Sequence, residues 1–167
     1  MKYLSERYFG YVFLGVLVWA QWHQAKIKSA ALITLYYASS TEESLTSLET
    51  NQRGYLYTGD PELYTAYIES KARYVTASRH LEQVLDDDPE ESVRFQQVEK
   101  TIQSKIAEMD QTIAFYRAGK QEDARKLVMS RQGQRYMTSI REVIGEIRAT
   151  KEIRAISAMN SVTGVDD

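Results

Sequence analysis

The chain contains no cysteine and only two prolines in its 167 residues. Without cysteine there is no disulfide bond, no thiolate nucleophile and no cysteine-ligated zinc. The compartment stays open, because many periplasmic domains also lack disulfides. Two prolines and eight glycines supply few of the turns that barrels or sandwiches of short strands need. These absences favour one helical domain.

Concentrated positive charge is also missing. The chain has 21 Lys and Arg against 23 Asp and Glu, spread along its length, with a net charge of −2. No basic stripe indicates a nucleic-acid partner. His23 and His80 lie far apart in no metal spacing, and the run Asp86-Asp87-Asp88 lacks the alternating ligands of a calcium loop. We expect no metal, no cofactor and no catalytic residue, so this chain is not predicted to be an enzyme.

One segment lacks charge altogether. Residues 8–25 contain no Asp, Glu, Lys or Arg, and as a helix they would reach about 27 Å, close to the ~30 Å hydrocarbon layer. Trp19 and Trp22 suit a membrane interface, although Gln21 and His23 shorten the apolar run. We predict a membrane anchor over residues 1–25, with a cleaved signal peptide or a buried apolar helix as alternatives. Positive charges tie on the two sides, so they do not decide the orientation.

Helix starts are marked twice by the same residues, in Asp60-Pro61-Glu62 and Asp88-Pro89-Glu90. Aspartate can cap free N–H groups, proline fits the first helical position, and glutamate faces the positive end of the helix dipole. We therefore expect helices near 61–86 and 89–117. Ala118-Gly119 ends the second of these, because glycine readily takes the left-handed conformation.

Apolar residues recur every seven positions, as in left-handed helix bundles. A short helix over 120–131 with Leu127 and Val128 buried, a break at 132–134 and a last helix over 134–160 complete the pattern. Gly145 is interpreted as a site of close packing. The prediction is an all-α antiparallel four-helix bundle. Its long first helix continues from the N-terminal membrane segment, and a short extra helix precedes the last. The seams are Tyr67, Tyr74 and Leu81, with Tyr64, Lys71, Ser78 and Leu85 beside them, and Phe95, Ile102, Met109 and Tyr116.

The stretch NQRGYLYTGDPELY, residues 51–64, places two glycines with the spacing of a phosphate-binding loop. Such a loop needs Lys and Ser or Thr after the second glycine, whereas Asp60-Pro61 follow here. We interpret the stretch as a helix–turn–helix corner. In that corner Gly54 allows close packing or a bend, Gly59 closes the first helix and Asp60 caps the next.

Four side chains near this corner could face a ligand. Arg53 can pair with Glu49 one turn earlier, or face an anionic ligand. Tyr64, Tyr67 and Tyr74 lie at helical spacing, which is typical of a packed core, although tyrosines can also line a ligand pocket. Both interpretations stay open for all four residues.

The corner resembles the signature of the CHASE sensory domains of the third class, a run close to E-T-G-Q-R-G-Y-L-L-T-G-D. The sequence departs from it at Asn51 and Tyr57. The pattern at Ala118–Arg125 and the break near Gly133 also resemble that family's connection between the third and fourth helices. The matching motif residues are Gln52, Arg53, Gly54, Tyr55, Leu56, Thr58, Gly59 and Asp60.

The resemblance implies a sensory domain over residues 26–160, followed by a tail at 161–167. Such domains are extracytoplasmic inputs of bacterial histidine kinases, cyclases and chemotaxis-type receptors, and they pass a signal through helix movements. We expect the protein to lie in the inner membrane, to form a homodimer and to bind an unknown small-molecule or protein ligand. A second membrane helix and an output module would follow in a longer protein, or a partner would carry the signal. The alternative is a non-sensing scaffold or protein-interaction module.

Overall fold

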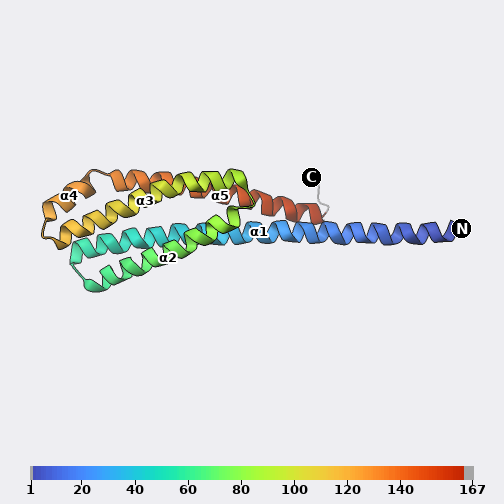
Figure 1. Ribbon diagram of the computed structural model, residues 1–167, viewed down its shortest axis with the longest axis horizontal. Helices are drawn as coiled ribbons and strands as arrows, with labels where there is room; N and C mark the ends of the chain where they lie inside the picture. Colours follow the sequence, from blue (N-terminus) through green and yellow to red (C-terminus); the bar gives the residue numbers. More distant parts are fainter. Residues whose placement is uncertain (1, 164–167) are drawn as a thin grey trace.

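The computed structural model describes residues 2–163, which form five α-helices and no strand (Figure 1). This confirms the all-α prediction. The helices are α1 (Lys2–Thr58), α2 (Pro61–Leu85), α3 (Pro89–Arg117), α4 (Gln121–Met129) and α5 (Gln132–Thr163).

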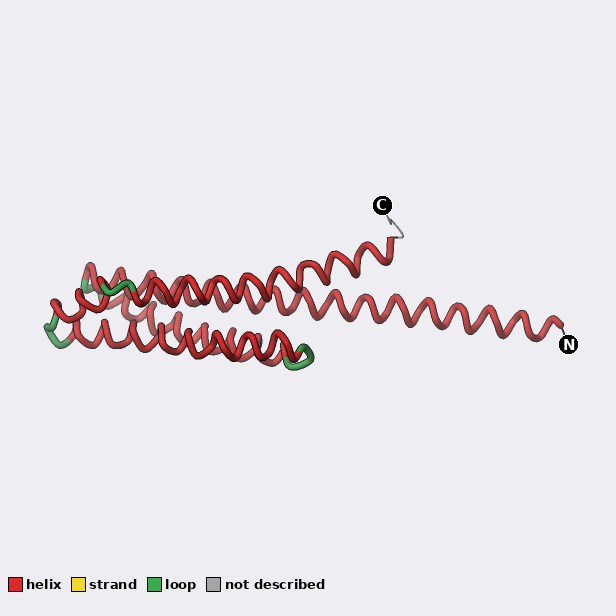
Figure 2. The backbone as a smooth tube through the Cα atoms, turned by 90° about the horizontal axis from the view of Figure 1, so that it is seen from above, coloured by secondary structure: helices red, strands yellow, loops and turns green. Residues whose placement is uncertain are grey.

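Four of these helices form an antiparallel bundle. α1 packs on α2 and α5, and α3 packs on α5 and on α4, which lies at the far tip. The four helices of the bundle run in alternating directions. The N-terminal end of α1 and the C-terminal end of α5 therefore lie at the same pole (Figure 1). α1 extends beyond the bundle there, and α5 bends away from it (Figure 2).

The core is built from most of the predicted seven-residue seams, whereas their members Tyr64, Lys71 and Tyr116 are only half-buried. Tyr67, Tyr74 and Leu81 of α2 are buried, and Phe95 and Met109 of α3 face them. Each large apolar side chain removed from water contributes roughly 1.5–3 kcal/mol, so this shared core holds the helices together. α1 and α5 add Leu45, Leu48, Ile140, Ile144 and Ile147.

The two aspartate–proline starts behave differently. Asp60 caps α2, because its Oδ1 accepts a hydrogen bond from the N–H of Glu62 at 2.9 Å. Asp88 stands at the same position before α3, but its side chain makes no capping bond. The capping prediction is therefore right for Asp60 and wrong for Asp88, whose carboxylate turns to α5 instead.

Four smaller predictions are corrected. α4 buries Ala124, whereas Leu127 is half-buried and Val128 exposed, because so short a helix touches the bundle along a narrow line. The break before α5 falls at Ser130 and Arg131, and Gly133 already belongs to α5. Gly145 is exposed, with no atom within 4 Å of where a Cβ would stand, so it marks no close packing. α5 continues to Thr163 into the predicted tail, whose residues 164–167 lie outside the described part.

The uncharged N-terminal segment is helical and continuous with the bundle, as expected. Tyr11, Leu14, Trp19 and Trp22 are exposed, so the segment is not a buried helix of this bundle. In residues 2–163, no helix contains a stretch both long and apolar enough to cross a bilayer. The membrane anchor stays a prediction.

Candidate functional site

The corner between α1 and α2 is fixed by local hydrogen bonds. Gly59 has φ +72°, and its N–H donates to the carbonyl of Tyr55 at 2.8 Å. The hydroxyl of Thr58 donates to the carbonyl of Gly54 and accepts from the N–H of Asp60. A Cβ on Gly54 would lie 3.0 Å from a methyl of Leu63. The corner thus has the predicted closing glycine, capping aspartate and close approach.

Arg53 forms the predicted pair with Glu49, with 3.1 Å between Nη2 and Oε1. The arginine side chain is 66% exposed, whereas the carboxylate is almost buried. The same Oε1 of Glu49 lies 3.1 Å from Nζ of Lys105, which also contacts Glu108 at 2.9 Å. Arg53 therefore lies at the rim of a buried ionic cluster joining α1 and α3.

Tyr67 and Tyr74 point into the core and end on carboxylates of α3. The Tyr67 hydroxyl donates to Asp110 at 2.7 Å, and the Tyr74 hydroxyl donates to Glu99 at 2.7 Å. Burial raises the pKa of both phenols well above the usual value, and the acceptor carboxylates raise it further. Both tyrosines remain neutral donors that tie α2 to α3.

Tyr64 lies half-buried at the edge of the core, in a group of aromatic rings. Its ring centroid is 5.3 Å from that of Tyr55 and 6.5 Å from that of Tyr67. The guanidinium of Arg117 lies 4.8 Å from its ring centroid, within cation–π range. This side chain therefore joins α1, α2 and the end of α3.

The described residues enclose several hollows. Tyr74 and Glu99 line one of about 440 Å³ between α2 and α3. His80, stacked on Tyr37 at 4.9 Å, lies beside one of about 820 Å³ between α1 and α2. Arg53 lines two others, one of about 520 Å³ towards α4 and one of about 100 Å³ beside Lys105. Of the four expected ligand-facing residues, Arg53 and Tyr74 thus border a hollow.

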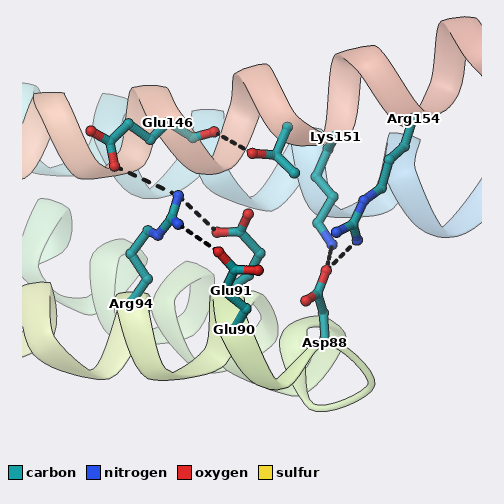
Figure 3. A network of polar contacts seen from close by, with 8 residues as sticks. Asp88, Glu90, Glu91, Arg94, Glu146, Lys151 and Arg154 are labelled. Atoms are coloured by element: carbon teal, nitrogen blue, oxygen red, sulfur yellow. Dashed lines mark hydrogen bonds and ion pairs between the residues drawn. The ribbon is translucent and has the colours of Figure 1, made fainter.

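At the opposite end of the bundle, the turn between α2 and α3 holds α5 by charge. Asp88 accepts a hydrogen bond from Lys151 at 2.7 Å and another from Arg154 (Figure 3). Burial raises the pKa of Asp88, but the hydrogen bonds and charges of Lys151 and Arg154 outweigh it and lower the pKa below the usual value. Asp88 therefore stays negatively charged and binds two cations of the last helix.

Arg94, six residues after Asp88, adds a second charged contact between α3 and α5. It lies between Glu90 and Glu91 of its own helix and Glu146 of α5, with 3.6 Å to the last (Figure 3). Glu91 is buried, and its Oε2 accepts no hydrogen bond from any residue that the structure describes. Charge pairs between α3 and α5 are thus gathered near the pole where the termini lie.

Two buried lysines were not identified from the sequence, Lys105 beside Glu49 and Glu108 and Lys151 beside Asp88, although the sequence contains a sign of both. Lys105 follows Val98 and Ile102 and precedes Met109, and Lys151 follows Ile144 and Ile147, each at the apolar spacing of its helix. A charge at a core position needs a partner. Which carboxylate supplies it depends on the packing. Among the described residues, no group of three or more His, Asp or Glu is placed to hold a metal ion.

Comparison with known proteins decides the family. The family model of the CHASE3 domain matches residues 31–160, most of the chain. The chain belongs to the CHASE3 family. A CHASE3 domain is a non-catalytic, extracytoplasmic input domain of a receptor, and residues 31–160 form such a sensory domain.

The fold of this CHASE3 domain is also found in a solved structure. It is similar to the crystal structure of the Rhodopseudomonas palustris histidine kinase HK9 sensor domain, with a TM-score of 0.69 and 18% identity. The match covers 74% of this chain and 97% of that one. At this identity the likeness shows the fold alone. A search of curated proteins gave no match.

Proposed function

We propose that this CHASE3 domain is anchored in the bacterial inner membrane by residues 1–25, with its bundle on the periplasmic side, and passes a signal along α1 and α5. The position of these two helices carries the proposal, because both lead to one pole. Exposed apolar side chains on the part of α1 that leaves the bundle support the anchor, among them Leu14, Val18 and Trp22.

The signal in this proposal is a movement of α5 against α1. The ion pairs that join α5 to Asp88 and Arg94 lie at the pole of the termini, and such contacts can exist in two arrangements that differ by a few kcal/mol. A stimulus that releases Asp88 from Lys151 would let α5 shift along the bundle. The output module would read that shift at the C-terminal end of α5.

A homodimer is the second part of the proposal. Ile33 and Tyr36 of α1 and Ile153 and Ile156 of α5 are exposed near the pole of the termini. Apolar groups on both signalling helices would be covered if two copies paired there. Paired helices would also transmit a shift of α5 to a dimeric output.

The topology is tested with a reporter enzyme that is active only outside the cytoplasm, fused after residue 28. We expect activity from intact cells and the fusion protein in the membrane fraction. Activity confined to a cytoplasmic reporter at the same position would reverse the orientation. Recovery of the fusion protein from the soluble fraction would contradict the proposed membrane anchor.

The absence of cysteine makes the dimer test specific. A single cysteine at Tyr36 should cross-link under mild oxidation in membranes, and one at Glu122, exposed at the far tip, should not. Equal cross-linking at both positions would indicate random collision and contradict the proposed pairing.

A further inference from the structure

The hollow of about 100 Å³ lies where α1, α3 and the turn before α5 meet. Gln52 and Arg53 line it from α1, Lys105 and Glu108 from α3, and Arg131 from the turn. A water molecule occupies about 30 Å³ in the liquid, so the space suits a molecule of a few non-hydrogen atoms. The hollow is therefore large enough for a small molecule, and three separate parts of the chain line it.

Gln52 offers the hollow an amide that binds no other described side chain. It is 3% exposed, and its side-chain amide makes no hydrogen bond within the part of the chain that the structure describes. Among the described residues, Oε2 of Glu91 is the one fully buried side-chain polar atom without a hydrogen bond, so the Gln52 amide is in contact with the open space of the hollow. A ligand in the hollow would supply the missing hydrogen bonds.

The charges around the hollow indicate the sign of that ligand. Glu49 and Glu108 are both engaged by Lys105, and Glu49 also by Arg53. Arg131 has no ion pair or side-chain hydrogen bond within residues 2–163. Three cations against two carboxylates leave one positive charge in excess, which favours an anion.

The start of α5 strengthens this preference. The first N–H groups of a helix have no partner within it, and they carry the positive end of its dipole. Gly133 lies in this first turn, close to Lys105 and Glu108, since a Cβ there would stand 2.5 Å from the lysine Nζ. The backbone of α5 thus begins beside the hollow, as in many anion sites.

We infer that this hollow binds a small monovalent oxyanion, of the size of acetate or nitrate, between the Gln52 amide, Arg131 and the first turn of α5. The inference rests on the proposed sensory function and gives it a ligand class. The bound anion bridges α1 to the start of α5, the two helices that lead to the membrane-side pole. Its binding therefore favours one position of α5 relative to α1.

The test measures binding to the purified full chain in detergent micelles, without any signalling assay. Sodium acetate and sodium nitrate are titrated separately, and ionic strength is balanced with sodium gluconate, whose anion is too large for the hollow. We expect a saturable rise in melting temperature for at least one of the two anions, because a ligand that binds only the native state stabilises it. The two titrations separate a carboxylate ligand from an inorganic one.

Two variants test the assigned residues. Gln52→Leu removes the unpaired amide while keeping the side-chain size, and Arg131→Gln removes an exposed charge, so both should fold. Each loses hydrogen bonds to a charged group, which weakens the apparent Kd by about ten-fold or more. Arg125→Gln is the matched control, because Arg125 is exposed and its one ion pair within residues 2–163 is with Glu122. The Kd of this variant should equal that of the parent.

Three outcomes would overturn the inference. One is the absence of any saturable effect of either anion. Another is equal binding by the parent and both variants. The last is stabilisation by methylammonium but by neither anion, which would reverse the assigned charge. None of these results would alter the reporter topology or the cross-linking, so the proposed function would fail or stand separately.

Discussion

Asp88, in the turn between α2 and α3, accepts a hydrogen bond from Lys151 of α5, with 2.7 Å between Oδ2 and Nζ. The lysine side chain is almost fully buried, and the carboxylate also accepts a hydrogen bond from Arg154. This contact joins residues that are 63 positions apart in the chain. It holds the last helix at the pole from which the signal would leave.

Replacing Asp88 with asparagine should lower the free energy of unfolding by about 1–3 kcal/mol. The change leaves the Lys151 ammonium buried without a full counter-charge, which costs more than the loss of a surface pair. Urea unfolding followed by circular dichroism measures the effect. Asp87→Asn is the control, since that neighbouring carboxylate is exposed, and its variant should match the parent. Equal stability of the two variants would show that Asp88 does not hold α5.

The same contact predicts loss of stability in acid. The folded-state pKa of Asp88 is lowered, so its stabilising effect is complete above the unfolded pKa of about 3.9. That effect is lost as the pH falls through the lower folded-state pKa. Unfolding free energies measured from pH 6 down to pH 2 should therefore fall less steeply for Asp88→Asn than for the parent. Parallel curves would contradict the pairing.

Tyr67 and Tyr74 predict the opposite dependence in base. Their folded-state pKa values are raised, so their stabilising effect is complete below the unfolded pKa of about 10 and is lost as the pH rises above it. The parent should lose stability between pH 10 and pH 12, and the double Tyr→Phe variant should lose less. Tyr57→Phe is the control, because Tyr57 is 91% exposed. Its alkaline curve should follow the parent.

Two glycines of α5 form a matched pair. A Cβ on Gly133 would stand 2.5 Å from Nζ of Lys105 and 2.7 Å from Oε2 of Glu108, both held in the buried cluster. Gly133→Ala should therefore cost about 1–3 kcal/mol. Gly145 is exposed and meets no atom, so Gly145→Ala should stabilise the helix by up to about 1 kcal/mol. Denaturant unfolding measures the change in unfolding free energy for each variant. Changes of the same sign in both would contradict these packing assignments.

These variants also show where sequence reasoning succeeds. The start of α2 and the seam Tyr67, Tyr74 and Leu81 were predicted correctly, because caps and helical spacing are local properties of the chain. The pair Arg53–Glu49 was also predicted, since its partners lie one turn apart. Local rules therefore account for the long helices and for the buried face of α2.

The errors arose where one helix meets another. Asp88 has every local mark of a cap, but two cations of α5 compete for its carboxylate more strongly than the free N–H groups of α3. Gly133 and Gly145 are alike in sequence, and only the neighbouring helix separates their roles. The hollow beside Gln52 likewise exists only because α3 and the turn before α5 do not fill the space there. Such features need the packed structure.

The central claim is that α5 is held by Asp88 and shifts against α1 when released. Spin labels on cysteines at Leu32 of α1 and Glu152 of α5, both exposed, report the distance between the helices by pulsed electron paramagnetic resonance in membranes. The account predicts a displaced distance distribution for Asp88→Asn, and the parent distribution for Asp87→Asn. Identical distributions in all three proteins would contradict it.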